Sequence, residues 1–215
     1  SGLLLSPLAM AKNLDVVASF SVLGDMVSHI GGDRVTVTDL VKPNGDPHEF
    51  EPSPKDSKTL ASADLVFVNG LGLEGWIDRL VTASGYHGNV ITASDGIETR
   101  SMVEDGKTET DPHAWNSMSN GVIYAHNIVN ALAKADPANA DYYRQQGDTY
   151  IKQLQGLDSY AKKTFAAIPP EKRKVLTSHD AFGYFGQAYG VTFLSPVGYS
   201  TESEASSKKV ASLIK

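Results

Sequence analysis

The sequence has 215 residues, 41% of them hydrophobic and 20% charged, which suits one large globular domain or two modest ones, each with a core. Its formal net charge of −6 and the lack of any Lys/Arg run argue against nucleic acid as a partner. The sequence has no cysteine. Disulfides, thiolate metal sites, cysteine nucleophiles and a lipid-modified cysteine are therefore excluded, and any metal ligands must come from His, Asp and Glu.

Residues 1–11 form a short apolar run that ends in the triplet Ala9-Met10-Ala11. This pattern is typical of the end of a secretory signal peptide, with cleavage near Ala11; the alternative is a tag remnant, such as Ser1-Gly2. No apolar segment approaches the ~20 residues needed to cross a bilayer. We therefore predict a signal-peptide remnant and an exported, periplasmic protein that does not itself insert into the membrane.

From Leu14, short β-branched runs alternate with stretches of helical periodicity. The predicted strands are 15–20, 34–40, 65–68 and 89–92. Helices are predicted from the end of the first strand to Gly31-Gly32, from an N-cap at Ser53-Pro54, and over 73–83. This alternation favours a parallel sheet with helices on both faces, which binds ligands beyond the carboxyl ends of its strands. The acidic stretch 97–111 is predicted to be an exposed loop.

The second half of the sequence contains a helix from 121 to about 134 and then a longer helical stretch from 137 to about 167. At ~40 Å, the longer helix exceeds an ordinary crossover and is suited to joining two lobes. Strands at 174–177 and 190–194 and a helix from 204 to 215 follow it. The predicted fold class is α/β, with two lobes of parallel sheet flanked by helices and joined by one long rigid helix. We assign residues 12–134 to an N-terminal lobe, 135–169 to the linker helix and 170–215 to a C-terminal lobe, expected to be truncated because the last helix reaches Lys215 without a stop signal.

Three of the six histidines share a loop context beside a carboxylate: His48 in Asp46-Pro47-His48-Glu49, His113 in Asp111-Pro112-His113, and His179 in Ser178-His179-Asp180. Proline stiffens the backbone before two of them, and a nearby carboxylate can accept the second ring N–H and fix the tautomer. Taken singly, each histidine is more often a surface or capping residue. Three in matching positions after strands predict one transition-metal site, assembled between substructures.

The other histidines are predicted to have ordinary roles. His29 lies near the end of a helix, where a cationic side chain is favourable, His87 lies in a turn, and His126 lies inside a helix.

Longer motifs surround these residues, including 45–54, the segment Ala63-Asp64-Leu65-Val66-Phe67-Val68-Asn69-Gly70, 111–115 and 178–185, with a further one at Thr201-Glu202-Ser203-Glu204-Ala205-Ser206. With these motifs the sequence resembles the zinc- and manganese-type solute-binding proteins of bacterial ABC importers. The resemblance implies one metal ion held between two lobes by His48, His113 and His179 and delivered to a membrane permease. It also implies a fourth ligand, an aspartate, beyond Lys215. We expect a monomer.

The metal implied by the resemblance is zinc or manganese, with iron as a further possibility. Three imidazoles favour zinc over manganese in the Irving–Williams order. However, the stretch from Glu98 to Thr110 contains no histidine, whereas many zinc-dedicated members have a histidine-rich loop there. This departure weakens an assignment to zinc alone.

Two other functions remain open from the sequence. A zinc hydrolase would also use three protein ligands and a water, with Glu49 or Asp180 as a base, but a site buried between lobes leaves little room for a substrate. A binding protein for an organic solute would use aromatic residues such as Trp76, Trp115, Tyr184 and Phe185. The helical spacing of Trp76 favours core packing instead. We therefore predict no enzyme activity.

Overall fold

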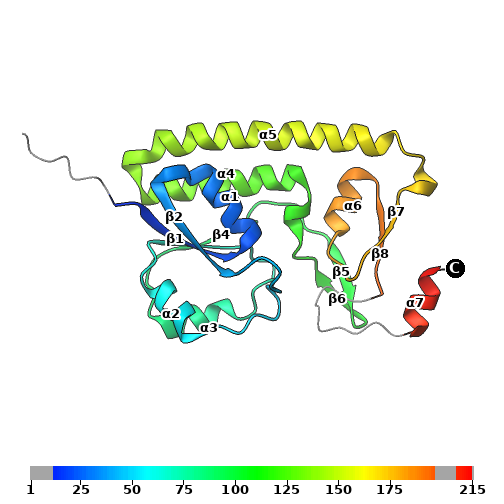
Figure 1. Cartoon of the computed structure of the whole chain (residues 1–215), viewed down its shortest axis with the longest axis horizontal. Helices are drawn as coiled ribbons and strands as arrows, with labels where there is room; N and C mark the ends of the chain where they lie inside the picture. Colours follow the sequence, from blue (N-terminus) through cyan, green and yellow to red (C-terminus); the bar gives the residue numbers. More distant parts are fainter. Residues whose placement is uncertain (1–11, 197–206, 215) are drawn as a thin grey trace, which may run out of the picture.

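The computed structural model describes residues 12–196 and 207–214. A four-stranded parallel sheet with the strand order β2-β1-β3-β4 forms the centre of the first part of the chain (Figure 1). Its elements are β1 (Leu14–Phe20), α1 (Ser21–Gly31), β2 (Val35–Val41), α2 (Pro54–Ala61), β3 (Leu65–Val68), α3 (Ile77–Ser84) and β4 (Val90–Thr92). The predicted parallel sheet is confirmed. The predicted signal-peptide remnant, residues 1–11, lies outside the described residues.

Helices cover both faces of this sheet, with α1 on one side and α2 and α3 on the other (Figure 1). Because both faces are covered, all four residues of β3 are buried apolar side chains, as is usual in a parallel sheet. Ser53 caps α2 through a capping box, in which its backbone N–H donates to Asp56 at 2.8 Å and its hydroxyl accepts from the Asp56 N–H. The predicted N-cap is confirmed.

Most of the acidic stretch predicted to be an exposed loop forms a β-hairpin, so the loop assignment is wrong, although most of its residues are exposed as predicted. Strands β5 (Ser101–Glu104) and β6 (Lys107–Thr110) pair antiparallel around Asp105 and Gly106, whose φ angles are 49° and 76°. Asp-Gly with two positive φ angles is a preferred two-residue hairpin turn. The many charges of the stretch favoured a loop over this turn in the prediction. Asp111, just after the hairpin, is fully buried.

Two helix starts also differ from prediction. Helix α3 begins at Ile77 rather than at residue 73, because Leu71 and Gly72 adopt positive φ angles of 58° and 81° in a turn. Helix α4 (Met118–Ala135) begins earlier than predicted, because the Ser117 side chain accepts a hydrogen bond from the Asn120 N–H and caps it.

Helix α5 (Ala140–Ala166), of 27 residues, is the predicted long helix and runs along both parts of the molecule (Figure 1). It contacts α1 and α4 in the first part and α6 (Gly183–Tyr189) in the second. The second part also has a parallel pair, β7 (Lys174–Leu176) and β8 (Thr192–Leu194), and helix α7 (Ser207–Ile214). Short 3-10 turns occur at Gly32–Arg34, Ala114–Asn116, Pro137–Asn139 and Pro170–Lys172.

The molecule has two separate apolar cores. The larger one is built from the four-stranded sheet and its helices, and the smaller one from Ala161, Tyr189 and Val191 with the partly buried Phe165 and Phe185. None of the helices among the described residues combines the length and the apolar character needed to span a bilayer.

Candidate metal centre

His113 lies in the loop after the β5–β6 hairpin, and its side chain is held by Asp111. Its backbone N–H donates to Asp111 Oδ1 at 3.0 Å, and its ring Nδ1 lies 2.7 Å from the same oxygen. His113 is only 3% exposed and Asp111 is fully buried. A carboxylate beside Nδ1 favours the tautomer in which Nδ1 carries the proton. The Nε2 lone pair of His113 is then available to bind a metal cation.

The Asp111 carboxylate stays ionised in spite of its burial. Burial raises the pKa of Asp111, but hydrogen bonds from His113 and from the Arg100 guanidinium outweigh this effect and lower it. Arg100 Nη1 lies 2.5 Å from Asp111 Oδ2, so each carboxylate oxygen has its own cationic or N–H partner. The negative charge of Asp111 makes the His113 imidazole a better electron donor.

His48 lies in the loop between β2 and α2 and is half-buried. Its backbone N–H donates to Asp46 Oδ1 at 2.9 Å, a local turn that shapes the loop. Burial and the neighbouring His113 lower the pKa of His48 to about 4, against a weaker opposing effect of Asp46. The His48 imidazole is therefore neutral at pH 7, which is the protonation state that binds a metal ion.

The two imidazoles point toward one another. The Nε2 atoms of His48 and His113 are 3.3 Å apart, although the residues are 65 positions apart in sequence. Two nitrogens bound to one tetrahedral ion at about 2.0–2.1 Å are separated by about 3.3–3.4 Å. The same separation also suits an N–H···N hydrogen bond, in which His113 Nε2 is the acceptor. The pair is thus preformed at a distance that fits a shared ion.

His179 lines the same cavity as this pair but does not join it. The cavity of about 520 Å³ is also lined by Trp115 and Phe182. In the described part of the chain, no three His, Asp or Glu side chains are grouped closely enough to hold a metal ion. Of the three predicted ligands, two are in contact, and the third faces the same space from the segment after β7.

The three histidines that were assigned ordinary roles lie away from this cavity. His29 lies on α1, where its Nδ1 is 2.8 Å from the Asp25 backbone oxygen and 3.6 Å from the Asp25 carboxylate. The side chains of His87 and His126 are exposed. Of the aromatic residues considered for an organic solute, Trp115 lines this cavity, whereas Trp76 is 4% exposed and packs on Phe50 in the larger core.

This geometry can be compared with known proteins. The family model described as "Zinc-uptake complex component A periplasmic", the ZnuA family, matches residues 16–215, nearly the whole chain. The chain belongs to the ZnuA family.

Relatives of known function agree with this assignment. The manganese ABC transporter substrate-binding lipoprotein PsaA of Streptococcus pneumoniae is 37% identical over 213 residues, which are 95% of this chain and 68% of that protein. The manganese-bound periplasmic metal binding protein from Candidatus Liberibacter asiaticus has a TM-score of 0.82 at 31% identity and covers 94% of this chain and 74% of its own. Its cadmium-bound form has a TM-score of 0.81 at 30% identity, with the same coverage.

The predicted resemblance and fold class are therefore confirmed. Members of the ZnuA family are solute-binding components of metal ABC importers, a class of binding protein rather than a family of enzymes. The structural match extends over 94% of the chain, so the similarity covers the whole fold and not the histidine motifs alone.

Sequence reasoning missed the residues of this ZnuA-family chain that hold the histidine loops in place. Trp76 is a core residue as predicted, but its indole N–H also donates to the Pro47 backbone oxygen at 2.7 Å, next to His48. Asn69 Nδ2 donates to the Pro112 backbone oxygen at 2.9 Å, next to His113. Asn69 directly follows a buried strand, and a polar residue at that position is the sequence feature that could have indicated a role near the site.

Proposed function

We propose that this chain captures a divalent transition-metal ion, Zn²⁺ or Mn²⁺, through His48, His113 and His179, and delivers it to the membrane permease of an ABC importer. The observation that carries the proposal is the 3.3 Å separation of the His48 and His113 Nε2 atoms. Two neutral imidazoles at this distance provide two adjacent ligand positions for one ion before the ion arrives.

In this proposal, His179 supplies a third ligand after the first two have bound the ion. His179 comes from the second part of the chain, and it lines the cavity into which the pair points. The three side chains are not grouped in the described residues, so the ion itself must draw the two parts together. Capture by closure suits a carrier, because reopening the cavity releases the ion to the permease.

The donor set and the relatives together support Zn²⁺ and Mn²⁺ as cargo. Three imidazoles favour Zn²⁺ in the Irving–Williams order, and a carboxylate ligand would extend the range toward Mn²⁺. The family is described by zinc uptake, PsaA by manganese, and the solved structures contain manganese or cadmium. These proteins give no support for iron, which stays an untested prediction, as does the monomeric state.

We place this activity outside the cytoplasm. The family description is periplasmic, and PsaA is a lipoprotein. A solute-binding protein meets its permease on the outer face of the cytoplasmic membrane. Delivery to the permease therefore requires that the chain be extracytoplasmic. The predicted signal peptide at residues 1–11 is consistent with this location and stays a prediction.

The zinc hydrolase and the organic-solute carrier are less well supported. Asp180, a candidate base for a hydrolase, borders a different cavity, beside Arg100 and Phe193. An organic solute would need an apolar wall, which Trp115 and Phe182 could supply, but two imidazole nitrogens 3.3 Å apart are better explained by a metal ion than by such a solute. Metal-dependent turnover of a test ester, or an organic molecule in native mass spectra, would favour these alternatives.

Metal analysis of histidine variants tests the proposal. The purified protein, loaded with Zn²⁺ or Mn²⁺ and dialysed, should retain about one ion per chain. His48→Ala and His179→Ala should each weaken binding by at least tenfold, since each removes one of few direct ligands. His126→Ala, which removes an exposed histidine on α4, is the matched control and should bind like the wild type. Full metal retention in both ligand variants would overturn the proposal.

A further inference from the structure

The end of the β5–β6 hairpin contains a hydroxyl group where a backbone hydrogen bond is expected. Ser101 pairs with Thr110, so the next pair outward is Arg100 and Asp111. The Asp111 N–H donates to the Arg100 oxygen at 2.9 Å, as in a hydrogen-bonded pair. The returning bond passes through Tyr184, whose hydroxyl accepts from the Arg100 N–H at 3.2 Å and donates to the Asp111 oxygen at 2.6 Å.

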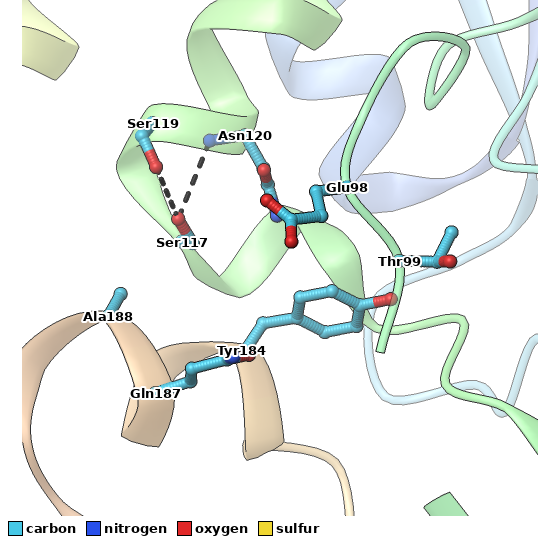
Figure 2. A pocket seen from close by; sticks show the side chains of 8 residues that line it. All are labelled: Glu98, Thr99, Ser117, Ser119, Asn120, Tyr184, Gln187 and Ala188. Atoms are coloured by element: carbon cyan, nitrogen blue, oxygen red, sulfur yellow. Dashed lines mark hydrogen bonds between the residues drawn. The ribbon is translucent and has the colours of Figure 1, made fainter. Parts of the chain in front are cut away.

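Tyr184 comes from a helix of the other part of the molecule, and its side chain is buried with the larger core. It lies on α6, five positions after His179, and its ring projects from α6 toward the chain at Glu98 and Thr99, as Figure 2 shows. The side chain is 4% exposed and forms one wall of a small polar cavity at the start of α4. A second hydrogen bond joins the same two segments, since Asn116 Nδ2 donates to the Ala181 oxygen at 2.9 Å.

We propose that Tyr184 is a positioning residue of the metal site, whose hydroxyl sets the segment that carries His179 in register with the loop that carries His113. This inference rests on the proposed function and adds a residue to it. Tyr184 touches neither histidine in the hydrogen bonds described here. It acts through Asp111, whose backbone oxygen it binds and whose carboxylate holds the His113 ring.

The hydroxyl bridges the Arg100 N–H and the Asp111 oxygen, so it replaces one of the two backbone hydrogen bonds of this pair. Without it, the Arg100 N–H and the Asp111 oxygen either pair directly, which pulls Asp111 toward Arg100, or remain buried without partners. In both cases we expect the Asp111 carboxylate to shift relative to His113, and the segment of His179 loses one of its attachments, while the hydrogen bond between Asn116 and Ala181 remains. The ring of Tyr184 can stay in place when the hydroxyl is removed, so any effect on the metal site is due to that one oxygen atom.

Tyr184→Phe removes only that oxygen, and Tyr189→Phe is a matched control on the same helix. The Tyr189 hydroxyl is also buried, accepts from the Met118 N–H at 3.0 Å and donates to Asp158 Oδ1 at 2.9 Å, but it does not contact the histidine loops. We expect Tyr184→Phe to weaken Mn²⁺ and Zn²⁺ binding by about tenfold, the range known for groups outside the direct ligands, and Tyr189→Phe to leave it within about twofold.

Measurements on the metal-free protein separate positioning from general stability. Both variants should melt below the wild type by comparable amounts, whereas the NMR signal of the His113 ring N–H should shift in Tyr184→Phe alone. Equal metal affinities in the two variants would overturn the inference while leaving the proposed function intact. Failure of the wild type to bind either ion would instead overturn the proposed function.

Discussion

At the scale of single residues, buried polar groups place the histidine loops. Asn69 is fully buried, and its amide donates to the Gly70 and Pro112 oxygens at 3.0 and 2.9 Å and accepts from the Tyr124 hydroxyl at 2.5 Å. Its backbone N–H donates to Glu74 at 2.6 Å. Its backbone oxygen accepts from the Ser94 hydroxyl at 2.6 Å, so each polar atom of Asn69 has a partner, and the end of β3 is fixed to the loop of His113.

Asn69→Ala should lower the free energy of unfolding by about 2–4 kcal/mol, because the Tyr124 hydroxyl and the Pro112 oxygen lose their buried partner. Asn127→Ala is the control, since the Asn127 amide also bridges two backbone oxygens, those of Ala93 and Asp95, but is only partly buried. Water can replace it, so we expect a loss below about 1 kcal/mol. Urea unfolding measures both, and equal losses would contradict the role given to Asn69.

At the scale of elements, α5 unites the molecule through its packing on α4. Gly147 on α5 packs closely on α4, since a Cβ atom there would lie 2.3 Å from Cγ2 of Val129. Val129 is β-branched and nearly fixed in its rotamer on a helix, so it cannot move aside easily. By contrast, at Gly156, nine residues further along α5, a Cβ atom would meet nothing within 4 Å among the described residues outside the local helix backbone.

The two glycines of α5 should therefore respond to alanine with opposite signs. Gly156→Ala should raise the free energy of unfolding by about 0.5–1 kcal/mol, because alanine has the higher helix propensity and meets no neighbour. Gly147→Ala should lower it by about 1–3 kcal/mol through overpacking against α4. Thermal and urea unfolding provide the comparison, and stabilisation by both substitutions would show that α4 and α5 are less closely packed than described.

At the scale of the whole molecule, the two parts meet at the cavity that contains the histidines. His48 and His113 come from the part built on the four-stranded sheet, and His179 comes from the part built on β7 and β8. Because α5 contacts helices of both parts, closure around an ion has a common support. A bound ion should then stabilise the chain as one unit.

Metal should accordingly raise the stability of the folded protein by mass action. At a free concentration about 100 times the Kd, Zn²⁺ or Mn²⁺ should add about 2.7 kcal/mol to the free energy of unfolding, provided that the unfolded chain binds the ion weakly. EDTA should reverse the gain. The His48→Ala chain at the same metal concentration should gain much less, and an equal gain in that variant would place the stabilising ion elsewhere.

Sequence patterns alone predict the α/β class, the order of most strands and helices, the long helix and the three candidate ligands. These features depend on local patterns, such as β-branched runs at 65–68, the N-cap at Ser53 and the Asp-Pro-His loops. The Asp-Gly turn of the hairpin is an equally local signal, but it lies in a stretch whose many charges are also typical of an exposed loop.

Which of these residues meet depends on the three-dimensional packing of the chain. The 3.3 Å contact between His48 and His113, and the insertion of Tyr184 between Arg100 and Asp111, join residues 65 and 73–84 positions apart. Such distances depend on how sheets and helices pack, because a local pattern carries no information on what lies across a core. Burial of Asp111 has the same origin: a charged residue in an acidic stretch becomes a buried support only once its partners surround it.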